Sequence, residues 1–70
     1  MFELMIKNRS IPFAKLGMKV SVEGRMGTIV GFHGLNLAVY FDGEYNYSNC
    51  HPHWKVTYYD DNMNIIADTF

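Results

Sequence analysis

The chain has 70 residues, a net charge of −1 and a single cysteine, Cys50. This length fits one domain, and such a domain buries only about 60% of the surface that the unfolded chain exposes. One cysteine excludes a disulfide within the chain, and the near-neutral charge argues against a simple nucleic-acid binder, which usually carries a basic excess. The lone thiol and the lack of a long apolar run predict a cytoplasmic protein without a membrane span.

A domain this small must gain its stability from unusually good packing, a metal or self-association. Aromatic residues make up 16% of the chain, as five Phe, five Tyr and one Trp. Each can bury roughly 150–250 Å², and Tyr and Trp keep a polar end for water or a partner. Aromatic packing is therefore one route to stability, and a small barrel is expected to bury about half of these side chains and leave the others outside.

The first sixteen residues fit two local structures. Apolar residues at positions 2, 4 and 6 alternate as in a strand, whereas those at 2, 5 and 6 suit one face of a helical turn. Ser10 is a potential cap for a single turn that ends at Gly17. We expect residues 1–16 to form an arm, or a short helical turn, that packs on or leads into the domain formed by residues 17–70.

From Gly17 onward, apolar residues recur at every second position between short turns. This alternation is typical of half-buried strands. The predicted strands cover residues 18–23, 28–32, 37–42, 45–50, 54–59 and 63–67. Gly31 predicts a bulge, and the proline in 51–53 predicts a turn because proline cannot donate to a central ladder. The pattern predicts an all-β domain, a five- to six-stranded small barrel or partly open roll.

Residues 17–59 resemble the small β-barrel proteins of the KOW and Src-homology-3-like type. The glycines and β-branched residues that carry the likeness are Val20, Val22, Gly24, Gly27, Ile29 and Gly31. The same pattern of strands and turns is also similar to that of compact barrel proteins of phages and mobile elements. The resemblance concerns the fold, because no family-specific binding residue is matched.

The densest group of reactive side chains is Cys50, His51 and His53, with His33 elsewhere in the chain. Thiolate and imidazole are ligands that zinc prefers, so these four residues are the candidates for a metal site. Structural zinc sites usually draw four ligands from paired motifs, and the chain has no second cysteine. A Cys–His nucleophile would need an orienting group and a concave site, for which so small a barrel offers little room. We expect no catalytic residues and no cofactor.

The surplus of aromatic side chains is the main candidate for a binding surface. The residues expected outside the core are Tyr40, Tyr45, Tyr47, Trp54 and Tyr59. Exposed tyrosines on adjacent strands favour protein interfaces, and they can also stack unpaired bases. The structural alternative is that these rings only cover the open ends of the barrel.

Three basic residues, Lys15, Lys19 and Arg25, fall near the first predicted strand and its loop. In KOW-like barrels this region can contact nucleic acid, so the resemblance implies the same possibility here. Three charges are few for binding driven by phosphates, and Glu23 lies among them. A solvated charged face is the simpler interpretation.

Taken together, the sequence predicts a non-catalytic binding module. Its expected partner is another protein or a second copy of the chain, engaged through exposed Tyr and Trp residues. The alternative is weak binding of RNA or single-stranded DNA through the same aromatic side chains and the three basic residues. A small zinc-binding protein is the third possibility.

Overall fold

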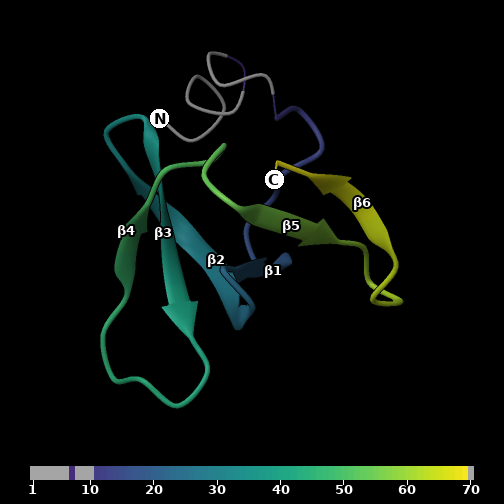
Figure 1. The fold of residues 1–70 in the computed structure, drawn as a ribbon. Coiled ribbons are helices and arrows are strands. Elements are labelled where there is room, and N and C mark those ends of the chain that lie inside the picture. Colours follow the sequence, from purple (N-terminus) through teal and green to yellow (C-terminus); the bar gives the residue numbers. More distant parts are fainter. Residues whose placement is uncertain (1–6, 8–10, 70) are drawn as a thin grey trace.

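The computed structural model describes Lys7 and residues 11–69. Within residues 11–69 it contains strands and turns but no helix, and its six strands form one antiparallel sheet in the order β4-β3-β2-β1-β5-β6 (Figure 1). The strands are β1 (Lys19–Val22), β2 (Arg25–His33), β3 (Asn36–Phe41), β4 (Ser48–Cys50), β5 (Val56–Tyr59) and β6 (Ile65–Asp68). The prediction of an all-β domain is confirmed. No helix in the described part of the chain is long and apolar enough to cross a membrane.

The sheet is bent but open. Strands β4 and β6 form its two edges and do not pair with each other, so the described strands do not close into a barrel. In Figure 1, β2, β3 and β4 form one wing of the sheet, β5 and β6 form the other, and β1 lies between them. The structure therefore confirms a small curved sheet but does not confirm a closed barrel.

Two bulges contribute to the curvature. Ile29 pairs with Val39 and Gly31 pairs with Ala38, which leaves Val30 as an extra residue in β2. A second irregularity in register lies between β5 and β6. A bulge bends its strand and increases the local twist. The bulge predicted at Gly31 is thus present, one residue earlier in the chain.

The turn between β1 and β2 requires a backbone that favours glycine. Its two central residues, Glu23 and Gly24, have φ values of 52° and 82°. Positive φ at both central positions is the signature of the tight turn that matches the twist of a β-hairpin. Positive φ places a small steric strain on Glu23, which has a Cβ atom, and none on Gly24.

Asp60 organises the turn between β5 and β6. Its Oδ1 accepts the backbone N–H groups of Asn62 and Asn64 at 2.9 and 2.8 Å. The N–H of Asn64 above all, together with that of Asn62, lowers the pKa of the Asp60 carboxyl. An aspartate that bonds to its own backbone in this way is a common way to fix a turn.

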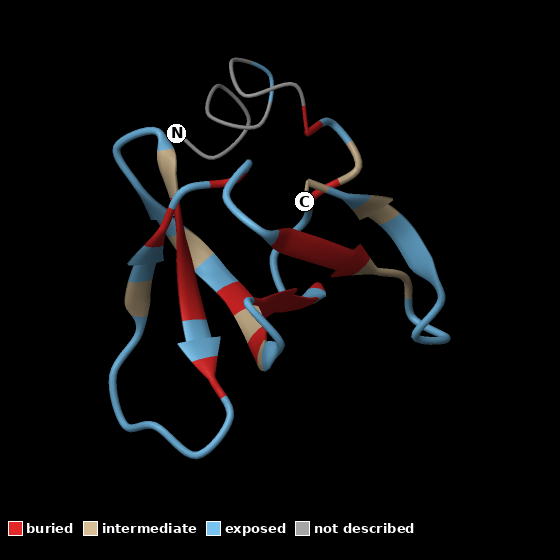
Figure 2. Cartoon of the chain, in the orientation of Figure 1, coloured by how far each residue is buried: buried red, intermediate tan, exposed pale blue. Residues whose placement is uncertain are grey.

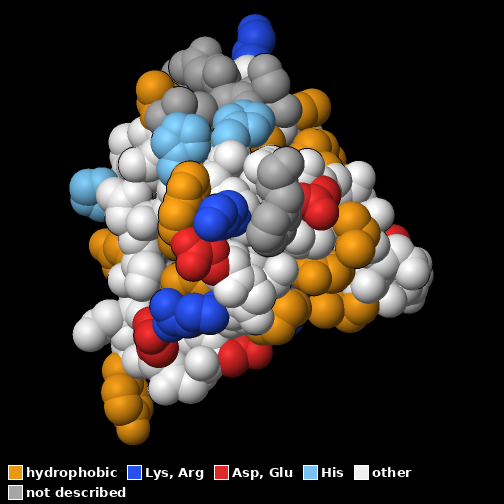
Figure 3. All heavy atoms as spheres, viewed as in Figure 1, with side chains coloured by type: hydrophobic (Ala, Val, Ile, Leu, Met, Phe, Trp, Pro, Cys, Tyr) orange, Lys and Arg blue, Asp and Glu red, His pale blue; other side chains and the backbone are white. Residues whose placement is uncertain are grey.

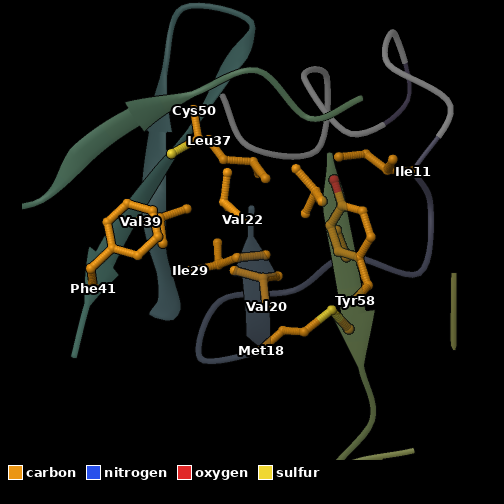
Figure 4. Close-up of a cluster of buried hydrophobic side chains, with 12 residues drawn as sticks. Ile11, Met18, Val20, Val22, Ile29, Leu37, Val39, Phe41, Cys50 and Tyr58 are labelled. Atoms are coloured by element: carbon orange, nitrogen blue, oxygen red, sulfur yellow. The ribbon is translucent and has the colours of Figure 1, made fainter. Parts of the chain in front are cut away.

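The core lies inside the bend of the sheet and is assembled from all the strands except β6 (Figure 2). Its members are Ile11, Ala14, Met18, Val20, Val22, Ile29, Leu37, Val39, Phe41, Cys50, Val56 and Tyr58. In Figure 4 the ring of Tyr58 stands among Ile11, Met18 and Val20. Phe13 adds an edge-to-face contact to this ring, with centroids 5.1 Å apart.

The N-terminal segment contributes to this core. Ile11 and Ala14 are buried, and the N–H of Ala14 donates to the carbonyl of Ile11 at 2.9 Å. Residues 11–16 therefore form a turn that packs on the sheet. The predicted cap at Ser10 and the predicted strand or helix over residues 1–6 lie outside the described residues.

The strand boundaries differ from the sequence prediction at several points. The fourth strand is only three residues long, so Tyr45 and Tyr47 belong to the preceding loop. Trp54 precedes β5 and does not share its buried face. Ser21 and Ala38, which alternation places outside, are buried. Small side chains are easily covered by larger neighbours on a curved face, which is why alternation alone misjudges them.

Gly27 is a position where the fold needs the absence of a side chain. A Cβ atom there would lie 2.7 Å from Val39 Cγ1 and 3.0 Å from the carbonyl oxygen of Tyr40. We expect Gly27→Ala to lower the free energy of unfolding by about 1–3 kcal/mol, because the packed neighbours cannot move away freely. Chemical denaturation measures this loss.

The matched control is Gly31→Ala in the same strand. A Cβ atom at Gly31 meets no atom within 4 Å, and its φ is not positive. We expect a change within about 1 kcal/mol of wild type in either direction. Equal losses for the two variants would show that strand propensity, and not the contact with Val39, sets the requirement at Gly27.

Candidate binding surface

One row of positions crosses four strands on the side of the sheet opposite the core. Lys19 pairs with Thr28, and Thr28 pairs with Tyr40. Val20 pairs with Tyr58, so the next positions along these two strands place Tyr59 beside Lys19. Side chains alternate between the two faces of a strand, and Val20 and Tyr58 are fully buried. The row therefore lies on the outer face.

Contacts on the outer face hold the members of this row in place. The ammonium group of Lys19 donates to the hydroxyl of Thr28 at 2.7 Å. The hydroxyls of Tyr59 and Ser21 lie 3.3 Å apart, so the ring of Tyr59 extends over β1. Ile65, the partner of Tyr59 on β6, is 63% exposed and extends the apolar part of the row to the edge of the sheet.

The loop between β3 and β4 adds two tyrosines at the other end of the row. The pairing of β3 with β4 ends at Val39 and Ser48, and Tyr47 is the loop residue directly before Ser48. The hydroxyl of Tyr40 donates to the carbonyl of Tyr45, which ties the strand to the loop. Tyr45 is 92% exposed and Tyr47 is 55% exposed. Figure 3 shows hydrophobic side chains projecting at the tip of this loop.

These residues form one surface, which we call the tyrosine face. Its members are Lys19, Thr28, Tyr40, Tyr45, Tyr47 and Tyr59. Four of the five predicted aromatic residues therefore come together, along with one of the three predicted basic residues. Thr28 was not predicted as a site residue, although its outward place in the alternation is visible in the sequence. Its role depends on the pairing of β1 with β2, which alternation does not reveal.

Trp54 lies apart from the tyrosine face. Trp54 lies two residues before Val56, and Val56 pairs with Val22. Val22 is at one end of β1 and Lys19 is at the other. The ammonium of Lys55 lies 5.4 Å from the centroid of the Trp54 ring, and the carbonyl of Lys55 accepts the N–H of Glu23 at 3.1 Å. Trp54 therefore adjoins the residue that bonds the β1–β2 turn, and the structure does not join it to the four tyrosines.

The other two predicted basic residues are paired with carboxylates. Arg25 bonds Glu44 at 2.5 Å and lies over the ring of Phe41, 4.3 Å from its centroid. Lys15 lies 3.5 Å from Asp61. Basic and acidic side chains accordingly border each other on the face seen in Figure 3. The three basic residues do not form a continuous positive surface.

The predicted zinc candidates are not arranged as ligands. Asn49 and Cys50 are consecutive residues of β4, so their side chains lie on opposite faces of the sheet. The Asn49 side chain lies 3.4 Å from His33 Nδ1, whereas the Cys50 thiol is buried in the core. His33 and Cys50 are therefore on opposite sides of the sheet. Among the described residues, no three His, Cys, Asp or Glu side chains lie close enough to hold a metal ion.

The two remaining histidines form a turn of their own. His51 and His53 have ring centroids 6.2 Å apart, and His51 Nδ1 accepts the backbone N–H of His53 at 3.1 Å. A neutral imidazole that accepts at Nδ1 carries its proton on Nε2. The Nδ1 atom of His51 is therefore already engaged within this turn.

Burial keeps two acidic groups of the core in their neutral forms. Burial raises the pKa of the Cys50 thiol, against a smaller opposite effect of Arg25. Burial also raises the pKa of the Tyr58 phenol, and the nearby Cys50 adds to this effect. The phenol donates to the carbonyl of Pro52 at 2.5 Å, so it anchors the turn at residues 51–53 to the core. A thiol kept protonated in this way is a packing group and a poor nucleophile.

Comparison with known proteins adds no further assignment: no protein-family model matches the chain, and neither a curated protein nor a solved structure is significantly similar to it.

The raised pKa values of Tyr58 and Cys50 predict a loss of stability at alkaline pH. Both groups ionise more readily in the unfolded chain, where their ordinary pKa values are 10.0 and 9.0. Their contribution to stability is therefore complete below these values and is lost as the pH rises above them. We expect the free energy of unfolding, measured by urea denaturation, to fall between about pH 8 and about pH 11.

Tyr58→Phe tests the share of Tyr58 in this loss. The variant leaves the carbonyl of Pro52 without its donor, so we expect it to be less stable at neutral pH by about 1–3 kcal/mol. It should then lose less stability than wild type on going to alkaline pH. Cys50 is present in both proteins, so an identical pH dependence would contradict the role given to Tyr58.

Proposed function

We propose that this chain is a non-catalytic binding module that contacts another protein through the tyrosine face. The observation that carries the proposal is the collection of four tyrosines from β3, β5 and the β3–β4 loop on one outer surface. Tyrosine is enriched at protein interfaces because it offers a large apolar ring and a polar end.

Two tyrosines of the tyrosine face are already held in place by hydrogen bonds, which supports this proposal. The hydroxyls of Tyr40 and Tyr59 each have a partner within the chain, the carbonyl of Tyr45 and the hydroxyl of Ser21. Immobilising a free side chain on binding costs about 0.5–1.5 kcal/mol. Rings that are already held in place avoid part of this cost.

We also propose that the fold is a variant of the KOW and Src-homology-3-like small barrels. The short strands, the sharp bend and the bulge in β2 support this proposal. Core side chains fill the bend of the sheet, which leaves its outer surface for the proposed binding.

Binding of RNA or single-stranded DNA is the alternative function. Lys19 among the tyrosines favours it, since bases stack on aromatic rings and phosphates bind cations. Against it, Lys15 and Arg25 are paired with Asp61 and Glu44, so few charges remain to release counterions from a phosphate chain.

A double variant, Tyr45→Ala with Tyr47→Ala, tests the tyrosine face. Both side chains are exposed and absent from the core, so the fold should survive. We expect proteins captured from a cell extract by the immobilised wild-type chain to be reduced at least about tenfold with this variant, as for hot-spot residues. Quantitative mass spectrometry of the captured proteins measures the change.

Met63→Ala is the matched control for this experiment. Met63 is 49% exposed in the β5–β6 turn, at the opposite edge of the sheet from β3–β4 (Figure 1). It should capture the same proteins as wild type. The proposal fails if the double variant captures the wild-type set, or if both variants lose it equally.

A second copy of the chain is one possible partner, and it predicts a separate behaviour. If the tyrosine face binds itself, the melting temperature rises with protein concentration and light scattering gives a dimer mass. The double tyrosine variant then becomes monomeric and melts at a temperature independent of concentration. A monomeric wild-type mass at every concentration restricts the proposal to other proteins.

A further inference from the structure

Lys19 is the one basic member of the tyrosine face, and it lies between two tyrosines. Tyr59 occupies the neighbouring position on β5, and Tyr40 lies two strands away on the other side, beyond Thr28. The ammonium group is directed along this row, because it donates to the hydroxyl of Thr28 at 2.7 Å. The surface therefore presents a positive charge with an aromatic ring on each side.

The charge of Lys19 is not compensated within the described residues. Lys15 and Arg25 each have a carboxylate within ion-pair distance, whereas no carboxylate of the described chain lies that close to Lys19. Its hydroxyl partner, Thr28, is neutral and leaves the ammonium with two further donors. A ligand that covers the tyrosine face without supplying an anion would leave this charge buried and unpaired, which costs binding energy.

From this arrangement, and resting on the proposed function, we infer that the partner supplies an extended acidic segment. A carboxylate of this segment binds Lys19, and apolar side chains on either side of it pack on Tyr59 and Tyr40. The charge of the tyrosine face and its two flanking rings are complementary to such a segment.

The spacing of the strands sets the pattern of the segment. Neighbouring strands lie about 4.8 Å apart, so the three intervals from Tyr59 to Tyr40 span roughly 14 Å. An extended chain covers this distance in about four residues. The segment therefore has an apolar residue, an Asp or Glu one or two positions later, and a second apolar residue about four positions after the first.

A nucleic acid fits the same surface less well. Two bases on Tyr59 and Tyr40 would place several phosphates near the row, where only Lys19 offers an unpaired charge. Asp42 is exposed on the turn that follows β3, close to Tyr40, and would repel the remaining phosphates. A peptide carries its negative charge only where an acidic residue stands, so the single ammonium favours a protein.

A phage-displayed library of random twelve-residue peptides tests the inference, with the wild-type chain, Lys19→Glu and Lys19→Gln as baits. We expect the wild-type chain to enrich peptides with Asp or Glu between apolar residues. Lys19→Glu should instead enrich Lys or Arg at the position between the apolar residues. Lys19→Gln should bind the peptides selected by the wild-type chain at least about tenfold more weakly. Lys19 is exposed, so both variants should remain folded, and a thermal melt of each variant checks this.

Lys15→Gln is the matched control, because Lys15 is exposed and already paired with Asp61. It should select the same peptides as wild type. The inference is overturned if the wild-type chain enriches no peptide, if the winners lack an acidic residue, or if Lys19→Glu selects the same peptides. A twelve-residue oligothymidylate that binds and displaces the winners would also overturn it in favour of single-stranded nucleic acid.

The outcome separates this inference from the proposed function. Peptides that need Tyr45 and Tyr47 but carry no acidic residue would leave the protein-binding function in place and remove the role of Lys19. Peptides that bind the double tyrosine variant as well as wild type would contradict the proposed function itself.

Discussion

The structure depends on one buried phenol more than on any other group. Tyr58 pairs with Val20 in the centre of the sheet, and its ring meets the edge of Phe13 from the N-terminal segment. Its hydroxyl reaches the carbonyl of Pro52 in the turn before β5. One side chain therefore links the middle of the sheet, the segment before it and the β4–β5 connection. A large ring with a satisfied polar end can thus join several parts of the chain around a core that is otherwise mostly aliphatic.

Because that ring and its neighbours fill the inner side of the bend, the tyrosine face lies on the outer side. The core positions of β1, β3 and β5 point inward, and the alternate positions of the same strands carry Lys19, Tyr40 and Tyr59 outward. The same backbone thus fixes the core and the tyrosine face together. A one-residue change of register in β1 or β3 would exchange the two sets, so packing of the core also enforces the geometry of the outer surface.

Much of the fold could be predicted from the sequence, because alternation and turn residues act over a few neighbours. The strands around Val20, Ile29 and Val39 follow from local pattern alone. The pairing of β1 with β5 does not, since it joins segments that are distant in the chain. The position of these tyrosines outside the core was predictable, but their arrangement relative to one another was not. Only the pairing shows that Trp54 lies apart from them and that Thr28 joins Lys19 to Tyr40.

The central position of β1 has a consequence for the order of folding. On one side it pairs with β2 through a tight turn, and on the other it pairs with β5 after an excursion of roughly thirty residues. Bringing β5 to β1 closes a long loop, which lowers the chain entropy before any stabilising contact forms. We therefore expect β1, β2 and β3 to associate first. In this order of events, the apolar side of the three associated strands would stay uncovered until β5 pairs with β1. Exposed apolar strands of this kind are prone to join other chains, so the distant pairing makes the slow step of folding also the step most open to aggregation.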